Sequence, residues 1–189
     1  MATDACKQKA GAAAVLVRDA RREDMPAIHR MIIDLATYEG MPDGPQLSVQ
    51  DLESDGFDSS PPWFFVVVAE CAGEIVGHAM CNRAYSSWTR RALYMEDLFV
   101  AEAWRRRGVA RALLRGVCER ARALGAERLD WHVLAHNEPA RRLYARLGAR
   151  DLCRTERRRA LRLDRDRILA VADGHLLPED AIDDDQLQS

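Results

Sequence analysis

Three β-prone runs followed directly by a helical run constrain the fold of this chain more than any other feature. The runs cover residues 64–69, 74–80 and 93–100, and they are rich in valine, phenylalanine and other strand-forming residues. Short runs of this kind, separated by turns, predict an antiparallel meander. Residues 108–124 then carry apolar side chains at helical spacing. We therefore expect a sheet with at least one helix packed on it.

The segments on either side complete an α+β pattern. Before the meander we expect a strand (14–18), a helix that begins at Glu23 and a short helix that Ser48 caps. After the helix at 108–124 we expect a strand (129–134), a helix (138–147) and a strand (160–163). This order predicts an α+β fold: one mixed central β-sheet with helices on both faces.

Length and charge set the organisation of the chain. It has 189 residues, of which 48% are hydrophobic, and this is enough for one domain with a substantial core. We expect that domain at residues 14–172, between flexible tails at 1–13 and 173–189, the second of which is acidic. The formal net charge of -2 provides no general attraction to nucleic acid or anionic lipid.

Cysteine, histidine and hydropathy patterns argue against several classes. The five cysteines are widely spaced without a CxxC pair, and the five histidines show no ligand spacing, so we predict neither a metal site nor a disulfide framework. No apolar run approaches the length of a transmembrane helix, and the N-terminus fits neither a secretory signal nor a transit peptide. We expect a cytoplasmic protein with no membrane or nucleic-acid partner.

The residues that best suit a binding site lie where the third run of the meander passes into the following helix. Residues 98–110 read LFVAEAWRRRGVA, and the N–H groups at such a helix start form an anion site together with the helix dipole. Gly108 and Ala110 would let a pyrophosphate approach the backbone, while the arginines would neutralise it. On spacing alone, an exposed arginine-rich helix start explains the pattern equally well.

The same stretch resembles a known motif. Arg105-x-x-Gly108-x-Ala110 after a strand is similar to the coenzyme A pyrophosphate motif of the GCN5-related N-acetyltransferase superfamily (GNAT). The superfamily's second hallmark, an Asn followed seven residues later by a Tyr, is matched by Asn137 and Tyr144. Further stretches resemble its diamine acetyltransferase family, which contains the spermidine/spermine N1-acetyltransferases and the thialysine N-epsilon-acetyltransferases. These stretches are residues 35–39, 51–57, 85–88, 93–100 and 148–152.

The resemblance implies the GNAT fold, acetyl-CoA as co-substrate, no metal and a homodimer. It further implies that the enzyme transfers acetyl to a primary amine of a small cationic substrate by direct attack in a ternary complex. A protonated amine cannot attack a thioester, so a carboxylate must remove a proton and an acid should assist the leaving thiolate. By resemblance, Glu96 is the base and Tyr144 is the acid. Taken alone, Glu96 could be a solvated strand carboxylate and Tyr144 a packing residue.

The resemblance also implies a cofactor site in three parts. Backbone groups of Leu98, Phe99 and Val100 would pair with the pantetheine like an added strand. The pyrophosphate would be surrounded by Arg105, Arg106, Arg107, Gly108, Val109, Ala110 and Arg111. The coenzyme arm would meet Asn137, Glu138, Pro139, Ala140 and Tyr144. An ordinary helix N-cap would explain Asn137 equally well.

The acceptor site implied by the resemblance combines carboxylates with aromatic faces, which suit a cation. Its members are Tyr38, Glu39, Trp88, Glu96, Asp97, Asp130, Trp131, His132 and Glu156. Three departures from the polyamine enzymes favour a lysine-like amino acid or short diamine over spermidine. Ser86-Ser87 stands in place of Asp-Pro, arginines follow Glu156, and Asp130-Trp131-His132 replaces a His-led triplet. The alternatives are a protein or peptide amine as acceptor, or a protein-binding scaffold with weak catalysis.

Overall fold

The computed structural model describes residues 14–177, so all of the first predicted tail and most of the second lie outside the described residues. The chain divides into two compact units, of which the first ends at Asn137 and the second begins at Glu138. Among the described residues, no helix combines the length and the apolar character that crossing a membrane requires.

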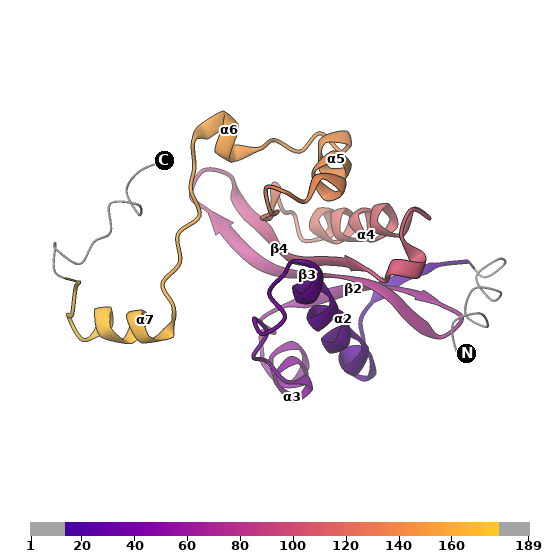
Figure 1. The fold of residues 1–189 in the computed structure, drawn as a ribbon, viewed down its shortest axis with the longest axis horizontal. Coiled ribbons are helices and arrows are strands. Elements are labelled where there is room, and N and C mark those ends of the chain that lie inside the picture. Colours follow the sequence, from indigo (N-terminus) through magenta and orange to yellow (C-terminus); the bar gives the residue numbers. More distant parts are fainter. Residues whose placement is uncertain (1–13, 178–189) are drawn as a thin grey trace. The chain divides into compact units, whose positions relative to one another are not determined.

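The first unit is built on a five-stranded mixed sheet with the strands in chain order (Figure 1). The strands are β1 (Leu16–Asp19), β2 (Phe65–Cys71), β3 (Glu74–Ser86), β4 (Arg90–Val100) and β5 (Arg128–Asp130). Neighbours are antiparallel except for β4 and β5, which run parallel. The predicted meander and the predicted mixed sheet are both confirmed.

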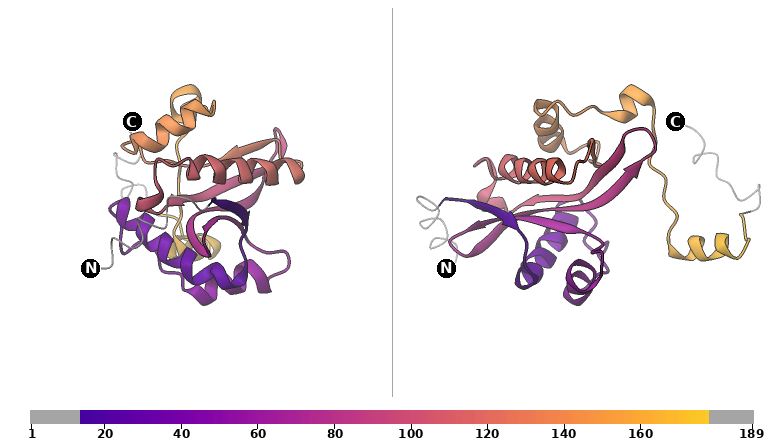
Figure 2. Two further views of the ribbon diagram at one scale, coloured as in Figure 1. Left: turned by 90° about the vertical axis from the view of Figure 1, so that its right-hand side faces the viewer. Right: turned by 180° about the vertical axis from the view of Figure 1, so that it is seen from behind.

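Helices cover both faces of this sheet, as Figures 1 and 2 show. They are α2 (Met25–Tyr38), α3 (Val49–Glu53) and α4 (Val109–Ala123). On one face α4 packs against β1 to β4, while on the other face α2 packs against β3, β4 and α3. The core under α2 consists of Met25, Ile28, Ile32, Leu52, Val66, Val68 and Met80. The start of α4 follows the end of β4 after a short loop, and Arg105 of that loop lies beside Tyr38 at the end of α2.

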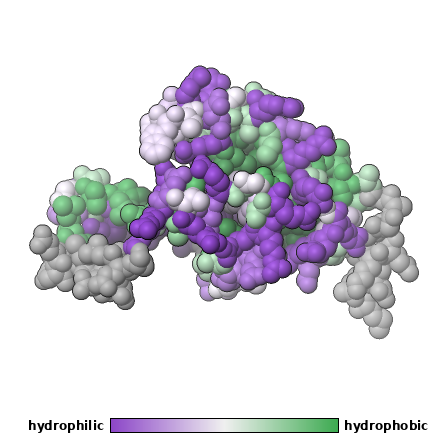
Figure 3. Space-filling view, turned by 90° about the horizontal axis from the view of Figure 1, so that it is seen from above, coloured by the Kyte–Doolittle hydropathy of each residue, from purple (hydrophilic) through white to green (hydrophobic). Residues whose placement is uncertain are grey.

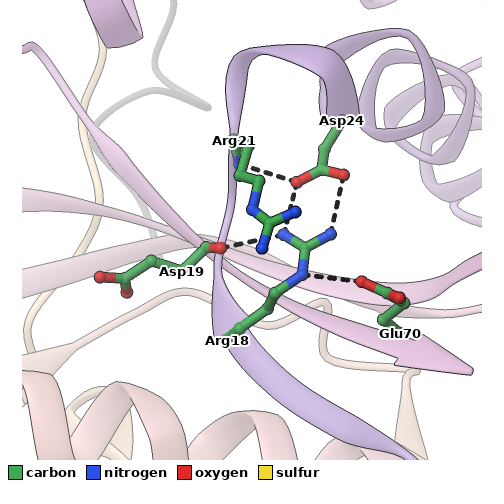
Figure 4. A network of polar contacts seen from close by, with 5 residues as sticks. All are labelled: Arg18, Asp19, Arg21, Asp24 and Glu70. Carbon is green, nitrogen blue, oxygen red and sulfur yellow. Dashed lines mark hydrogen bonds and ion pairs between the residues drawn. The ribbon is translucent and has the colours of Figure 1, made fainter. Parts of the chain in front are cut away.

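A charged cluster joins the start of α2 to the sheet (Figure 4). The Arg18 guanidinium on β1 donates to both carboxylate oxygens of Asp24, at 2.7 and 3.0 Å, and to Glu70 of β2 at 2.7 Å. The backbone N–H of Arg21 also donates to Asp24, at 2.7 Å. Burial opposes the ionisation of Asp24, but these donors outweigh it, and the pKa of Asp24 is lowered. We call Arg18, Asp24 and Glu70 the Arg18 cluster.

The second unit is helical over its described residues. Its helices are α5 (Glu138–Arg146), α6 (Leu152–Glu156) and α7 (Arg165–Ala172). Apolar side chains gather on α7 (Figure 3), where Ile168 is 54% exposed and Leu169 is 49% exposed.

Two strand predictions are wrong in part or in full. The strand predicted at 129–134 ends at Asp130, and the strand predicted at 160–163 is absent from the described residues. Alternating leucine and arginine make a strand only where a sheet edge buries the leucines. Leu161 is 91% exposed and Leu163 is 56% exposed, and the described part of the second unit offers no strand to pair with.

Candidate active site

The first feature of the site is an unpaired stretch at the edge of β4. β5 pairs with β4 only at Ala92, Leu93 and Tyr94, whereas β4 continues to Val100. Within residues 14–177, no strand pairs with the β5-facing edge of β4 from residue 95 to residue 100. An extended ligand can add to such an edge through main-chain hydrogen bonds. We call residues 95–100 the open edge of β4.

The side chains of Leu98, Phe99 and Val100 on the open edge are partly or fully buried. Phe99 is 6% exposed and Val100 is 8% exposed, so both belong to the core, and Leu98 is half-buried. The side chains of Phe99 and Val100 are therefore out of reach of a ligand, which could contact the backbone of these two residues.

The second feature is the start of α4, which follows the open edge after a short loop. Gly108 has φ of +85°, a left-handed conformation that favours glycine, and a Cβ added there would meet nothing within 4 Å. The first main-chain bond within α4 runs from the Ala112 N–H to the Gly108 carbonyl, at 3.0 Å. The N–H groups of Val109, Ala110 and Arg111 thus precede the helical ladder. Together with the helix dipole, this geometry suits a phosphate.

The arginines of the loop differ in their contacts. Arg105 donates from Nε to the Val100 carbonyl at 3.1 Å, and its guanidinium lies 4.8 Å from the ring centroid of Tyr38. Arg107 lies 5.3 Å from the ring of Trp104. Arg105 therefore ties the loop to the ends of β4 and α2, a positioning role that the motif alone did not reveal. The phosphate contacts predicted for Arg105, Arg106, Arg107 and Arg111 stay predictions.

The third feature is a β-bulge at Glu96. Met80 of β3 lies opposite Asp97, and the next residue, Cys81, lies opposite Met95. Glu96 is thus the extra residue on β4, and its side chain is exposed. A bulge turns a side chain away from the regular alternation of a strand and is common next to active sites. Here it occurs on the open edge, at the residue predicted to be the base.

The fourth feature is a pair of carboxylates beside the bulge. Glu39 caps the C-terminus of α2, and Asp97 follows Glu96 on β4. Burial and the negative charge of Asp97 raise the pKa of Glu39, which His136 offsets only in part. We call them the Glu39–Asp97 pair. The structure brings these two predicted acceptor residues together, and Tyr38 lies next to Glu39 in the chain.

The end of β5 contributes a further contact. The Tyr94 hydroxyl lies 2.5 Å from Nδ1 of His132, and their ring centroids are 5.6 Å apart. Asp130 accepts from Nε of Arg128 at 2.7 Å. Trp131, which lies between Asp130 and His132 in the chain, is half-buried. The sequence reasoning gave Tyr94 no role, because its contact with His132 depends on how β4 pairs with β5.

Other predicted residues lie elsewhere. Trp88 is at the tip of the β3–β4 hairpin and is 79% exposed. Glu96 lies six residues after Arg90 on β4, which is roughly 20 Å along the strand at about 3.3 Å per residue. The second unit holds Glu138, Pro139, Ala140 and Tyr144 on α5. It also holds Glu156, whose carboxylate pairs with Arg158 at 2.7 Å and with Arg150 at 3.7 Å. Asn137 directly precedes α5, as predicted for an N-cap. The roles of all these residues stay predictions.

Comparisons with known proteins agree with this geometry. The family described as Acetyltransferase (GNAT) matches residues 11–149. The thialysine N-epsilon-acetyltransferase of Sus scrofa is 38% identical over 152 residues, covering 76% of this chain and 89% of that protein. Its Bos taurus counterpart is 35% identical over 150 residues, covering 75% and 88%. An integron cassette protein from V. cholerae shares the fold with a TM-score of 0.67 and 22% identity, covering 84% and 97%.

The sheet opens beside a helix N-terminus, with carboxylates at the opening, and the comparisons assign this arrangement to the class of acetyl-transferring enzymes. The chain belongs to the acetyltransferase (GNAT) family. It is an acetyl-CoA-dependent N-acetyltransferase, and the fold and enzyme class predicted from the sequence are confirmed.

Proposed function

We propose that the enzyme acetylates a primary amine of a small cationic acceptor, a thialysine-like amino acid or a short diamine. The observation that carries this proposal is the Glu39–Asp97 pair beside the bulge at Glu96. At neutral pH a carboxylate whose ionisation is opposed by burial and by a second negative charge binds a cation well, because the cation relieves the repulsion. The names of the two mammalian relatives support an acceptor of the thialysine type.

The proposed reaction uses the open edge of β4, the N-terminus of α4 and Tyr144. Acetyl-CoA supplies the thioester; the backbone of Leu98 to Val100 holds its extended arm, and the N-terminus of α4 holds its pyrophosphate. Glu96 removes a proton from the bound ammonium, directly or through water. The free amine attacks the thioester carbonyl, so that a C–N bond forms as the C–S bond breaks. Tyr144 gives its proton to the departing sulfur.

The number of available carboxylates favours an acceptor of low charge. Ser86 accepts hydrogen bonds at Oγ from the N–H groups of Trp88 and Thr89, at 3.1 and 3.2 Å, so it holds the turn and offers no charge to a ligand. Glu156 is already paired with two arginines. A polyamine with three or four ammonium groups would find fewer partners here than a diamine or a lysine analogue.

We also propose a homodimer in the cytoplasm. The family resemblance implies the dimer, and two features support it. Trp88 lies too far along the hairpin to reach Glu96 of its own chain, and apolar side chains of α7 are exposed. A second copy would bring Trp88 of one chain towards an acceptor site of the other. Analytical ultracentrifugation of the full chain tests the dimer.

The decisive experiment is coenzyme A thiol release by the purified full chain. The amines are thialysine, lysine, putrescine, spermidine and a lysine-containing peptide, with a control that lacks an acceptor. We expect the highest kcat/KM with thialysine or putrescine. Acetyl-CoA binding without thiol release from any small amine would overturn the proposal, and release with the peptide alone would indicate a protein acceptor.

A substitution at the bulge tests the mechanism. We expect Glu96→Gln to lower kcat by about 10²- to 10⁴-fold at neutral pH, since it removes the base. The affinity for acetyl-CoA, measured by calorimetry, should stay the same. Glu102→Gln is the matched control, because Glu102 is an exposed carboxylate six residues further along. Equal turnover by Glu96→Gln and Glu102→Gln would remove Glu96 from the mechanism.

A further inference from the structure

His78 is a buried side chain whose hydrogen-bonding capacity is unused. It lies in the middle of β3, opposite Phe99, and its side chain is 0% exposed. Among the described residues, neither Nδ1 nor Nε2 has a hydrogen-bond partner. An unpaired buried polar group costs free energy, and such groups are rare enough in native proteins to need an explanation.

The position of His78 offers that explanation. Its Nε2 lies 3.8 Å from Oδ2 of Asp97, whose side chain is 20% exposed. A hydrogen bond between such groups spans about 2.7–3.0 Å, so a shift of about 1 Å by the carboxylate closes it. Asp97 therefore interacts with two groups: Glu39 at the end of α2, whose ionisation it opposes, and His78, which is buried in the sheet.

The other neighbour of His78 does not compete for this contact. The Phe99 ring centroid lies 6.3 Å from that of His78, in a tilted arrangement, and Phe99 offers no hydrogen-bonding group. Asp97 is thus the acceptor that the described structure places within reach of Nε2.

We propose that His78 is a positioning residue for the amine acceptor. In the complex, the Nε2–H of His78 donates to Oδ2 of Asp97 and turns the other carboxylate oxygen towards the ammonium group, next to Glu96. This inference rests on the proposed function, because it requires Asp97 to bind the acceptor. The capacity of Nε2, which is unused in the free enzyme, is then used in the complex.

The test compares two substitutions in the full-length enzyme. His78→Phe keeps an aromatic ring but removes the donor, and His78→Gln keeps an N–H close to the position of Nε2. We expect His78→Phe to raise the KM for the amine about tenfold, as the loss of one hydrogen bond to a charged group does. The KM for acetyl-CoA should change less than about twofold by the same reasoning, and His78→Gln should restore most of the amine KM.

A double-mutant cycle separates positioning from a packing role. In an Asp97→Asn background, His78→Phe should have no further effect on the amine kcat/KM, because the partner carboxylate is gone. An equal effect in both backgrounds, or a parallel rise in both KM values with a lower melting temperature, would overturn the proposal in favour of simple packing.

A spectroscopic measurement does not depend on substitutions. Long-range ¹⁵N–¹H correlation spectra of the histidine rings should show a change at Nε2 of His78 when the amine is added. An unchanged Nε2 signal at saturating amine would overturn the proposal. If no amine is acetylated by the wild-type enzyme, the proposed function itself fails, which the thiol-release assay shows before any His78 variant is made.

Discussion

The two ends of α2 carry charged groups in opposite arrangements. At its start, Asp24 accepts from Arg18 and from the Arg21 N–H, and its pKa is lowered. At its end, burial and the charge of Asp97 raise the pKa of Glu39. The helix dipole agrees with both pKa shifts. It favours an ionised carboxylate at the N-terminus, where Asp24 lies, and disfavours one at the C-terminus, where Glu39 lies.

The difference separates a stabilising cluster from a binding site. The Arg18 cluster is complete within the chain, and each of its bonds is made in the folded protein without a ligand. The Glu39–Asp97 pair keeps an unfavourable interaction that folding does not relieve. A carboxylate such as Glu39, whose pKa is raised by burial and a like charge next to an open edge, is typical of a functional site.

The largest effect should come from breaking the Arg18 cluster. Arg18→Met leaves the carboxylates of Asp24 and Glu70 without their partner. We expect a loss of about 3–5 kcal/mol in the free energy of unfolding, measured by urea denaturation at neutral pH. In enzyme that remains folded, the KM for the amine should be unchanged, since the cluster lies at the other end of α2.

Arg22→Met provides the control for that substitution. Arg22 pairs with Glu53 and Asp58, but its side chain is 44% exposed, so water and salt weaken these pairs. Its stability change should be much smaller than that of Arg18→Met. Similar losses for both variants would show that the Arg18 cluster has no special role.

The sequence predicts the helices that carry these charged groups, but it does not by itself predict which distant groups approach one another. The helix at α2 followed from apolar spacing, and Ser48 was identified as the N-cap of α3, where its Oγ accepts from the Asp51 N–H at 3.2 Å. Such patterns are local. The approach of Glu39 to Asp97 came from family resemblance, because 57 intervening residues separate them in the chain.

What the sequence could not reveal depends on register and on distant partners. The bulge at Glu96 exists because of how β3 and β4 align. A glutamate at this position does not by itself predict a bulge. The same holds for Arg105, whose contact with Tyr38 requires the folded end of α2, and for His78, which the sequence shows only as a histidine without ligand spacing. The strand predicted at 160–163 was wrong because alternation alone does not provide a partner edge.

Removing one charge from the Glu39–Asp97 pair should have an intermediate effect. We expect Glu39→Gln to raise the KM for the amine by about threefold to tenfold at neutral pH, because half of the cation-binding charge is lost. At the same pH the melting temperature should rise slightly, since the repulsion with Asp97 disappears. Steady-state kinetics and thermal unfolding of one preparation check both. An unchanged amine KM with a lower melting temperature would mean that Glu39 serves the fold and not the acceptor.

The smallest expected effect is a pair of pH dependences with opposite signs. The folded protein holds the proton on Glu39 more tightly than the unfolded chain does. The stability contribution of Glu39 therefore falls as the pH rises from its ordinary value of 4.5 through the raised pKa. Asp24 behaves in reverse: its contribution is complete above its ordinary value of 3.8 and is lost as the pH falls through the lowered pKa.

The pH range in which the contribution of Glu39 changes lies above the range in which the contribution of Asp24 changes. Unfolding curves measured between about pH 3 and pH 7 can therefore separate the two contributions. The advantage of Glu39→Gln over the wild type should be present at neutral pH and should vanish as the pH approaches 4.5. The deficit of Asp24→Asn should persist at pH 4.5 and shrink only below 3.8. If both differences changed in the same window, the two ends of α2 would not be electrostatically distinct. The fold would then compensate the charge on Glu39 as well as it compensates the charge on Asp24. That result would contradict the proposal that the Glu39–Asp97 pair binds the cationic acceptor.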